Sequence, residues 1–289
     1  MNTPQIAAFA RLAKENTPPV SALEGQKTLI SRTMHALEYD AIHDELVVNS
    51  PLNNAILTFR GGAKGEEAPV RVILGPHTQI QSTGYDGNDK MAMDVANGEI
   101  YIGVATSGGA GKGVILVFDR ESNGDVPPKR VLGGPDTGFN FPSAKGQGFP
   151  HMAIDPKRNL LIVSTGGALR VFDRTASGNV KPKFVIQGPN TLLRAGGGSG
   201  GSVKITEAGW IVAECERGSV CAYNVNESGN VAPHWKVPVA QIAPVGLAGQ
   251  LTLDPIHKEL IAPNGGRNVV MTFSWPEVFD EPAPPAVSR

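Results

Sequence analysis

Residues 151–188 read HMAIDPKRNLLIVSTGGALRVFDRTASGNVKPKFVIQG. Four segments of this stretch alternate apolar with other side chains, and short runs rich in Gly, Pro, Asn and Lys separate them. Such segments predict β-strands, because alternate residues of a strand point to opposite faces and turns need these residue types. The four predicted strands, called A to D below, are 151–155, 160–164, 168–174 and 183–188. Four consecutive antiparallel strands make one blade of a β-propeller.

The same unit recurs along the chain with a period near fifty residues. An aromatic residue of strand C is followed ten positions later by proline, or by Ala283 in the last unit, and in four units glycine follows sixteen positions on. A unit of this kind buries its apolar face only when neighbours stack on it, so the repeat predicts an all-β propeller. The aromatic residues are Phe9, Phe59, Phe118, Phe172, Tyr223 and Phe273; the prolines are Pro19, Pro69, Pro128, Pro182 and Pro233; the glycines are Gly25, Gly75, Gly134 and Gly188.

Strand A occurs five times, so we expect five blades of four antiparallel strands in a single propeller domain spanning residues 1–289, with a six-bladed ring containing an incomplete blade as the alternative. The A strands are 34–40, 90–96, 151–155, 201–207 and 249–255. The predicted parts are a closing strand segment at 1–33, repeats at 34–80, 81–139, 140–193 and 194–242, and a last blade with its tail at 243–289.

The two ends of the chain complement each other. Residues 4–25 contain a C-like and a D-like segment without A or B, whereas the last unit loses its hairpin pattern after Trp275. We therefore expect the strand VSALEG, residues 20–25, to complete the last blade and close the ring, which would hide two sheet edges. A helix over 4–15, with Thr3 as its N-cap, and strand exchange between two chains are the alternatives.

The composition limits the function classes. Lys plus Arg number 26 and Asp plus Glu 27, with no basic stripe, which argues against a nucleic-acid partner. No apolar run is long enough for a membrane span, so we expect a soluble protein of unknown compartment, with export after loss of a signal peptide left open. Cys215 and Cys221 flank a predicted turn of five residues, where either a cross-strand disulfide or two unpaired thiols would fit.

The units resemble the NHL-repeat and SMP-30-like propeller superfamily of bacterial repeat proteins. The resemblance rests on the patterns DPxxxxL and VFDRxxxGxVxPxxxIxGPxT, as at residues 155–161 and 171–191, and it covers nearly the whole chain. It implies the propeller fold, but it does not imply one activity, because propellers support many chemistries and many of them catalyse nothing.

The loops differ between the two faces of the predicted disc. The C-to-D hairpin has a fixed length, whereas the B-to-C turns and the connections from D to the next A vary. A rigid scaffold with variable loops on one side is a common way to carry a binding site, although glycine in these loops also serves tight turns. We expect the variable face to bind a small ligand or a protein through residues at the starts of A strands and near the B-to-C turns. The candidates are Lys90, His151, Lys204, Gln250, Asn49, Asn264 and Arg267.

An enzyme is the alternative interpretation, and the sequence does not decide between the two. His151, His35 and Glu38 could act as acid or base, and oxygen ligands near the axis would suit calcium. For this alternative, the resemblance suggests a metal-assisted hydrolase or lyase related to lactonases, in which acidic and amide side chains hold the ion. Glu38 is the one A-strand glutamate expected to face inward, which departs from that pattern. The calcium candidates are Glu38, Asp86, Asp89 and Glu214.

Overall fold

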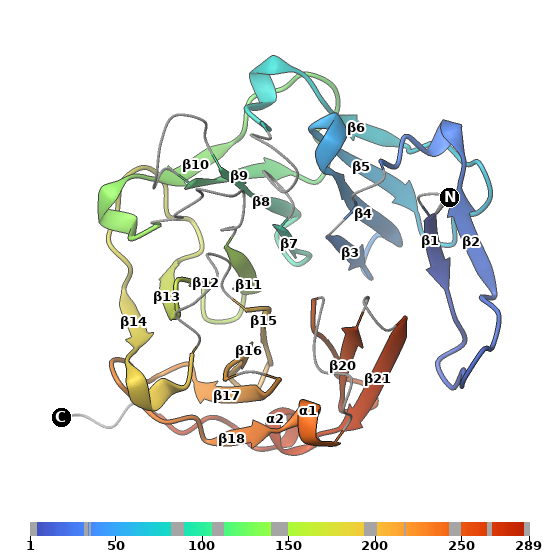
Figure 1. The fold of residues 1–289 in the computed structure, drawn as a ribbon. Coiled ribbons are helices and arrows are strands. Elements are labelled where there is room, and N and C mark those ends of the chain that lie inside the picture. Colours follow the sequence, from blue (N-terminus) through green and yellow to red (C-terminus); the bar gives the residue numbers. More distant parts are fainter. Residues whose placement is uncertain are drawn as a thin grey trace. The chain divides into compact units, whose positions relative to one another are not determined.

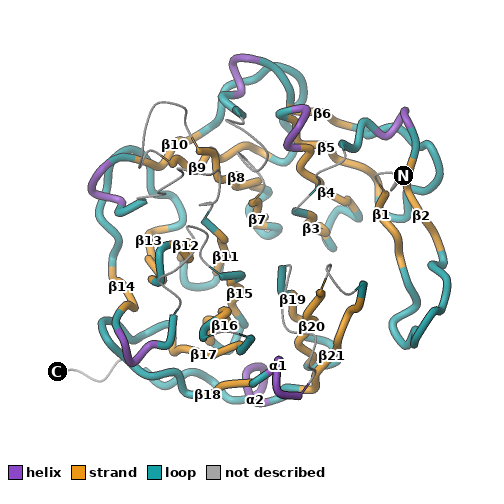
Figure 2. Tube along the Cα trace, in the orientation of Figure 1, coloured by secondary structure: helices purple, strands orange, loops and turns teal. Residues whose placement is uncertain are grey.

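The computed structural model describes residues 5–31, 34, 36–81, 90–105, 113–139, 150–193, 201–216, 218–242, 250–264 and 268–285. The chain divides into two compact units, and the boundary between them passes through β9 and β10. Almost all regular structure is β-strand, and the helices are short segments between strands (Figures 1 and 2). The all-β prediction is therefore confirmed.

The first unit contains a two-stranded sheet and two four-stranded sheets, the second of which reaches the boundary. All three are antiparallel, and strands that follow one another in the chain pair with one another (Figure 1). The strands are β1 (Gln5–Ala8) with β2 (Ser21–Glu24); β3 (Leu37–Asp40), β4 (Glu45–Ser50), β5 (Ala55–Arg60) and β6 (Arg71–Ile73); and β7 (Lys90–Asp94), β8 (Glu99–Ala105), β9 (Gly113–Asp119) and β10 (Arg130–Gly133).

The second unit contains two further four-stranded sheets and a three-stranded sheet. The strands are β11 (His151–Asp155), β12 (Leu160–Thr165), β13 (Ala168–Asp173) and β14 (Phe184–Gln187); β15 (Val203–Ile205), β16 (Trp210–Glu214), β17 (Val220–Asn224) and β18 (Trp235–Val237); and β19 (Thr252–Asp254), β20 (Glu259–Asn264) and β21 (Val269–Ser274). The two short α-helices are α1 (Val239–Ile242) and α2 (Glu277–Asp280).

The aromatic residue of strand C anchors the core of each full sheet. Phe172 pairs with Leu161 on β12, and its side chain is 1% exposed. Phe59, Phe118 and Tyr223 hold the same place and are each fully buried. Burial of an aromatic side chain is among the largest single contributions to a core, which explains why this position marks the repeat.

Neighbouring sheets within a unit pack through their A strands. β3 lies beside β7, and β11 lies beside β15. One apolar cluster joins the sheets β11–β14 and β15–β18, with Ala153 and Ile162 on the first side and Val203 and Ile211 on the second. Each sheet therefore buries one face against the next, as a stacked repeat requires.

A repeated contact, called the clasp below, links each C-to-D hairpin to strand D of the preceding sheet. Its backbone part is an isolated parallel bridge from a hairpin glycine, for example Gly178, to a D-strand residue, here Leu132. Gly178 has a φ of 71°, a left-handed conformation that glycine adopts without steric cost. The four bridges are Leu23 with Gly65, Ile73 with Gly124, Leu132 with Gly178, and Ile186 with Gly229.

The side-chain part of the clasp caps a 3-10 turn that follows strand D. Asn179 Oδ1 accepts a hydrogen bond of 2.8 Å from the backbone N–H of Asp136, in the turn η4 (Pro135–Thr137). The residue before this turn, Gly134, has a φ of 127°, and a Cβ there would lie 2.6 Å from Asn179 Oδ1. Both facts explain why the position is glycine. The equivalent caps are Glu66 on Gln26 of η1 (Gln26–Thr28), Asp125 on His77 of η3 (Pro76–Thr78), and Asn230 on Asn190 of η5 (Pro189–Thr191).

We expect the substitution Asn179→Ala to lower the free energy of unfolding by about 1 kcal/mol, the usual effect of removing a capping side chain. The alanine cannot accept from the Asp136 N–H or donate to the Asp136 carboxylate, which Asn179 Nδ2 reaches at 3.0 Å. The measurement is the midpoint of urea unfolding, with the exposed Lys181→Ala of the same hairpin as the control. Equal midpoints for the two variants would contradict a stabilising role of the clasp.

The N-terminal segment forms strands, as predicted, and not the alternative helix. The structure differs from the predicted ring closure in one respect. β2 pairs with β1 in a sheet of its own, and its other edge contacts Gly65. The last sheet, β19–β21, has three strands among the described residues. VSALEG is therefore not seen as its fourth strand, because β1 and Gly65 already take the hydrogen bonds of both edges of β2.

The C-terminal tail packs back onto the sheet β15–β18. Trp210 Nε1 donates a hydrogen bond of 2.6 Å to the carbonyl of Glu281, and Asn224 Nδ2 donates one of 2.8 Å to the carbonyl of Pro284. Trp275 and Val278 join an apolar cluster with Trp210. After Trp275 the chain thus packs on the sheet β15–β18 and does not continue as a C-to-D hairpin, which explains the loss of the hairpin pattern.

Candidate functional site

Strand pairing brings the start of each A strand next to the end of the following B strand. His151 at the start of β11 pairs with Ser164 near the end of β12, and Lys90 at the start of β7 pairs with Gly103 of β8. This end of each sheet is called the A-start end below. Among the described residues, those predicted to bind a ligand lie at or near this end of their own sheet.

Most of the described candidates are half-buried. Lys90, His151 and Gln250 lie at or next to strand starts, Lys204 lies inside β15, and all four are partly exposed to solvent. Glu38 and Glu214 are also half-buried.

Asn49 has a structural role that the sequence did not indicate. Its Oδ1 accepts a hydrogen bond of 3.0 Å from the backbone N–H of Ala36, and its side chain is fully buried. Ser202 has a similar role in the second unit, where its Oγ accepts a hydrogen bond of 2.9 Å from the backbone N–H of Leu251. Buried polar groups are normally paired in this way. Asn264, at the end of β20, is 6% exposed.

Four candidates lie outside the described residues: His35, Asp86, Asp89 and Arg267. Two of the four residues proposed for calcium are among them. Glu38 and Glu214, the other two, belong to different units. The calcium set therefore stays a prediction, as do the catalytic roles of His35, His151 and Glu38.

Cys215 and Cys221 form a disulfide, with their Cα atoms 5.8 Å apart. Of the two interpretations left open by the sequence, the cross-strand bond is the one present. The bond joins the residue after β16 to β17, next to Glu214. It therefore closes the B-to-C turn at the A-start end of this sheet.

A reductant should lower the free energy of unfolding by about 2 kcal/mol, the chain-entropy contribution expected for a short closed loop. The double variant Cys215→Ala/Cys221→Ala should show no response to reductant. Urea unfolding with and without dithiothreitol measures the difference, and a thiol titration of the unfolded, unreduced protein should find no free sulfhydryl. Equal sensitivity of both proteins to reductant, or a positive titration, would contradict the disulfide.

The opposite end of the sheets carries turns closed by acidic side chains. Asp254 Oδ1 accepts from the backbone N–H of His257 at 3.0 Å, and His257 Nδ1 lies 2.7 Å from Asp254 Oδ2. These hydrogen bonds from His257 hold the pKa of Asp254 below its ordinary value. Asp40 and His43 make the same contacts in the first A-to-B turn.

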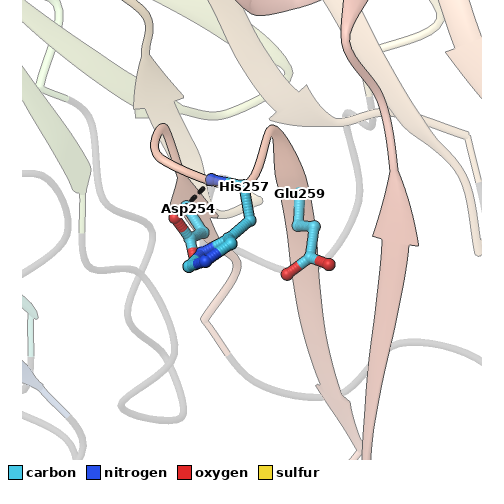
Figure 3. Close-up of side chains that lie close together, drawn as sticks. All are labelled: Asp254, His257 and Glu259. Atoms are coloured by element: carbon cyan, nitrogen blue, oxygen red, sulfur yellow. Dashed lines mark hydrogen bonds and ion pairs between the residues drawn. The ribbon is translucent and has the colours of Figure 1, made fainter. Parts of the chain in front are cut away.

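Glu259 joins Asp254 and His257 to form a group whose ligand atoms lie within 4.8 Å of one another (Figure 3). Two of the three are already engaged in closing the turn, and that arrangement recurs at Asp40. The group lies at the far end of its sheet from the predicted site, at the turn between β19 and β20. Its geometry is explained by the turn.

The most strongly perturbed acid in the described part of the first unit is Glu99, at the start of β8. Its side chain is buried, and Arg130 donates two hydrogen bonds of 2.7 Å to its two oxygens. Burial alone would raise the pKa of Glu99, but the hydrogen bonds from Arg130, Tyr101 and Lys129 outweigh it and lower the pKa to about 2. The group is therefore a charged structural pair, unsuited to proton transfer near neutral pH.

The same two positions hold different pairs in other sheets. Glu45 contacts Arg71, and also Arg120 of the next hairpin at 3.0 Å. In the second unit the positions of Glu99 and Arg130 are taken by Leu160 with Phe184, and by Trp210 with Trp235. The two indole rings pack edge to face, and their centroids are 4.4 Å apart. An ion pair and an apolar pair thus serve the same packing role.

The comparisons with known proteins bear on the fold. No family model matches the sequence, and no curated protein matches it. Among solved structures, the chain is similar to the β-propeller domain of Cps50 (Swd1) from Myceliophteria thermophila, with 10% identity over 88% of this chain and 71% of that chain and a TM-score of 0.55. At this identity the likeness shows the fold alone.

The chain is accordingly a β-propeller with five blades, one for each sheet that begins with an A strand. The predicted fold class and blade count are confirmed, and β1–β2 is additional to the five. Membership of the NHL and SMP-30-like superfamily is not shown by the likeness. Among the described residues, no helix has the length and apolar character needed to cross a membrane.

Proposed function

We propose that this protein is a non-catalytic propeller that binds a small molecule or a protein partner at the A-start end of its blades. The observation that carries the proposal is the contrast between the two ends. At the other end, four C-to-D hairpins form the clasps, and acidic side chains such as Asp40 and Asp254 close the A-to-B turns. At the A-start end, equivalent strand positions instead carry different polar side chains, such as Lys90 and His151.

The clasp repeats a glycine followed by Glu, Asp or Asn in four hairpins, whereas positions that recognise a ligand gain from differing between repeats. Lys90 and His151 occupy the same place in successive blades, and the equivalent place in the first blade is Ala36. Within the second unit, a site built from unlike groups such as His151 and Lys204 would be asymmetric, as recognition of an asymmetric ligand requires. Glu99, whose pKa is lowered to about 2 by its hydrogen bonds, is at the start of a B strand and serves packing.

Two finer assignments belong to the same proposal. We place the chain in the NHL and SMP-30-like superfamily on the strength of its repeat patterns, and the propeller fold supports this coarsely. We also infer export from the producing cell, because disulfides such as Cys215–Cys221 persist in oxidising compartments.

A thermal-shift screen tests the binding proposal. The probes are a library of sugars, small carboxylates, amines and lactones, since a compound that binds only the folded state raises its melting temperature. Each hit is then titrated against the triple variant Lys90→Ala/His151→Ala/Lys204→Ala. We expect the stabilisation by at least one compound to be lost in this variant.

The matched control is Lys157→Ala/Lys181→Ala, which removes two exposed lysines from the A-to-B turn and C-to-D hairpin of the same blade. It should respond to the compound like the wild-type protein. Circular dichroism establishes that the triple variant is folded. Unchanged stabilisation in the triple variant would overturn the assignment of the site, and conversion of a hit into a product, seen by nuclear magnetic resonance, would favour the enzyme.

A further inference from the structure

The C-terminal tail, residues 281–285, continues from α2 as an extended segment rich in proline. α2 ends at Asp280, and Glu281 has an extended backbone with a φ of −90° and a ψ of 113°. The tail reads EPAPP and belongs to no helix or strand. Proline has no backbone N–H and its ring fixes φ, so such a segment stays extended without hydrogen bonds of its own. Its carbonyl groups and the N–H of Ala283 are therefore left for other partners.

The turn before β16 and the first residue of β16 bond to the main chain of the tail. Trp210 Nε1 donates a hydrogen bond of 2.6 Å to the Glu281 carbonyl, and the Ala283 N–H donates one of 2.8 Å to the Ala208 carbonyl. Gly209 leaves room for this approach, because a Cβ there would lie 3.2 Å from the Cβ of Ala283. The single N–H between the prolines is thus satisfied.

Two amide side chains at the end of strand C hold the next part of the tail. The Nδ2 atoms of Asn224 and Asn226 both donate to the Pro284 carbonyl, at 2.8 Å and 2.9 Å. All these contacts lie within the second unit. The surface that makes them is called the tail site below, and it consists of Ala208, Gly209, Trp210, Asn224 and Asn226.

The indole donor is particular to the blade that carries the tail site. Trp210 begins β16, and the residues that begin strand B in the other blades have side chains without an N–H group. These residues are Glu45, Glu99, Leu160 and Glu259. Only a tryptophan at this place can donate to a carbonyl of the tail.

Asn224 likewise differs from its equivalent in the preceding blade. It pairs with Trp210 as Asp173 pairs with Leu160. Both Asn224 and Asp173 accept a hydrogen bond from the backbone N–H two positions on, at 2.8 Å and 2.9 Å. The change from aspartate to asparagine keeps this acceptor and adds the Nδ2 donor that the Pro284 carbonyl uses.

We propose that the tail site recognises an extended Pro-x-Pro segment, and that the tail is its resident ligand, which binds in cis and can leave while the blades stay folded. Donors aimed at main-chain carbonyls suit such a segment, because carbonyls are what a proline-rich chain offers. A proline-rich segment is also extended before it binds and loses little conformational freedom.

The burial of the tail agrees with a ligand that can leave. Trp275 and Val278, which precede it, are 5% and 0% exposed and anchor the chain in the apolar cluster. Glu281, Pro282 and Pro284 are exposed. The chain after Ser274 therefore divides into a buried anchor and an end held chiefly by hydrogen bonds, which water can replace.

A variant of the full chain tests whether the tail can leave. Ala283→Pro removes the N–H that bonds to Ala208. The indole N–H of Trp210, observed by nuclear magnetic resonance, should then exchange with water about tenfold faster, the factor that corresponds to one lost hydrogen bond. The indole N–H of Trp275 should exchange at the wild-type rate, because the anchor stays in place.

A free peptide tests recognition of the segment. EPAPP, the sequence of residues 281–285, is titrated to about 10 mM into Ala283→Pro, because a short linker gives the attached tail a millimolar effective concentration. The Trp210 indole signal should return to its wild-type position with saturation. The same peptide with N-methylalanine in place of Ala283 lacks the N–H and should not restore the signal.

Two exchanges of amide and carboxylate locate the binding. Asn224→Asp in the Ala283→Pro background gives the fourth blade the residue of the third, and it should weaken peptide binding by about tenfold because one donor is lost. The matched control is Asp173→Asn in the same background, which makes the reverse exchange at the equivalent place of the third blade. It should bind the peptide as the Ala283→Pro parent does.

Several results would overturn the inference. Unchanged exchange at Trp210 in Ala283→Pro, or loss of the Trp275 protection together with it, would show that the tail is an integral part of the fold. Failure of EPAPP to restore the signal, or equal affinities of the Asn224→Asp and Asp173→Asn proteins, would exclude recognition by the tail site. A dimer in light scattering that Ala283→Pro abolishes would show that the tail binds a second copy and not its own chain.

Discussion

Arg130→Ala is expected to lower the free energy of unfolding by about 3 kcal/mol, because it leaves the buried carboxylate of Glu99 without its main partner. Tyr101 and Lys129 still contact the carboxylate, which places the effect at the lower end of the range for a broken buried pair. Urea unfolding measures the change. The control Lys129→Ala removes a half-exposed partner and should cost less than about 1 kcal/mol.

The chain supplies a repair for this defect. In the third blade the positions of Glu99, Tyr101 and Arg130 hold Leu160, Ile162 and Phe184, which are buried or packed against the core. The triple variant Glu99→Leu/Tyr101→Ile/Arg130→Phe should recover most of the lost stability, since a well-packed apolar set often equals a buried ion pair. A triple variant as unstable as Arg130→Ala would show that the blades are not equivalent at this position.

Acid should remove the contribution of Glu99. The pKa of its carboxyl is about 2 in the folded protein, whereas the ordinary value of 4.5 represents the unfolded chain. A lowered folded pKa stabilises the protein above the unfolded pKa, and the contribution disappears as the pH falls from about 5 toward 2. The shift corresponds to roughly 3 kcal/mol at neutral pH.

Comparison with Glu99→Gln separates this effect from those of other carboxylates, such as Asp173, whose pKa is lowered by hydrogen bonds from Thr175. The difference in unfolding free energy between wild type and Glu99→Gln should be largest above pH 5 and should shrink as the pH approaches 2. Chemical unfolding at several pH values measures it. A difference that stays constant over this range would rule out titration of Glu99 as the cause.

Local patterns predicted the strands well where alternation and turn residues agree. Strand A of the third blade spans His151–Asp155 in the structure, as predicted. The fixed distance from Phe172 to Gly188 reflects the clasp, because the hairpin must reach the preceding D strand. The capping residues were missed, although each follows the hairpin glycine directly and is always Glu, Asp or Asn. Those residues are Glu66, Asp125, Asn179 and Asn230.

Contacts between distant segments were not predictable in the same way. Whether Cys215 and Cys221 form a disulfide depends on the distance between their Cα atoms across the turn, and the sequence alone does not give that distance. The partners of β2 depended on Gly65, forty residues downstream, so the role of VSALEG was missed. Asn49 resembled a ligand-binding residue, but its burial and its bond to Ala36 are visible only in three dimensions.

Of the candidate site, the sequence indicated the end of the blades at which the polar residues gather, because strand direction follows from chain order. It could not indicate which of them a ligand touches. Lys90, His151 and Lys204 are half-buried on A strands, and position in a strand does not specify what surrounds a side chain. Their roles therefore rest on the proposed function.

Hydrogen–deuterium exchange with a compound from the thermal-shift screen tests the division of labour between the two ends most directly. Binding should slow exchange in peptides that contain the starts of β7, β11 and β15, which carry Lys90, His151 and Lys204. Exchange at the hairpin glycines Gly124 and Gly178 should stay unchanged. Protection confined to those hairpins or to the A-to-B turns, with none at the A-strand starts, would contradict the proposed binding site.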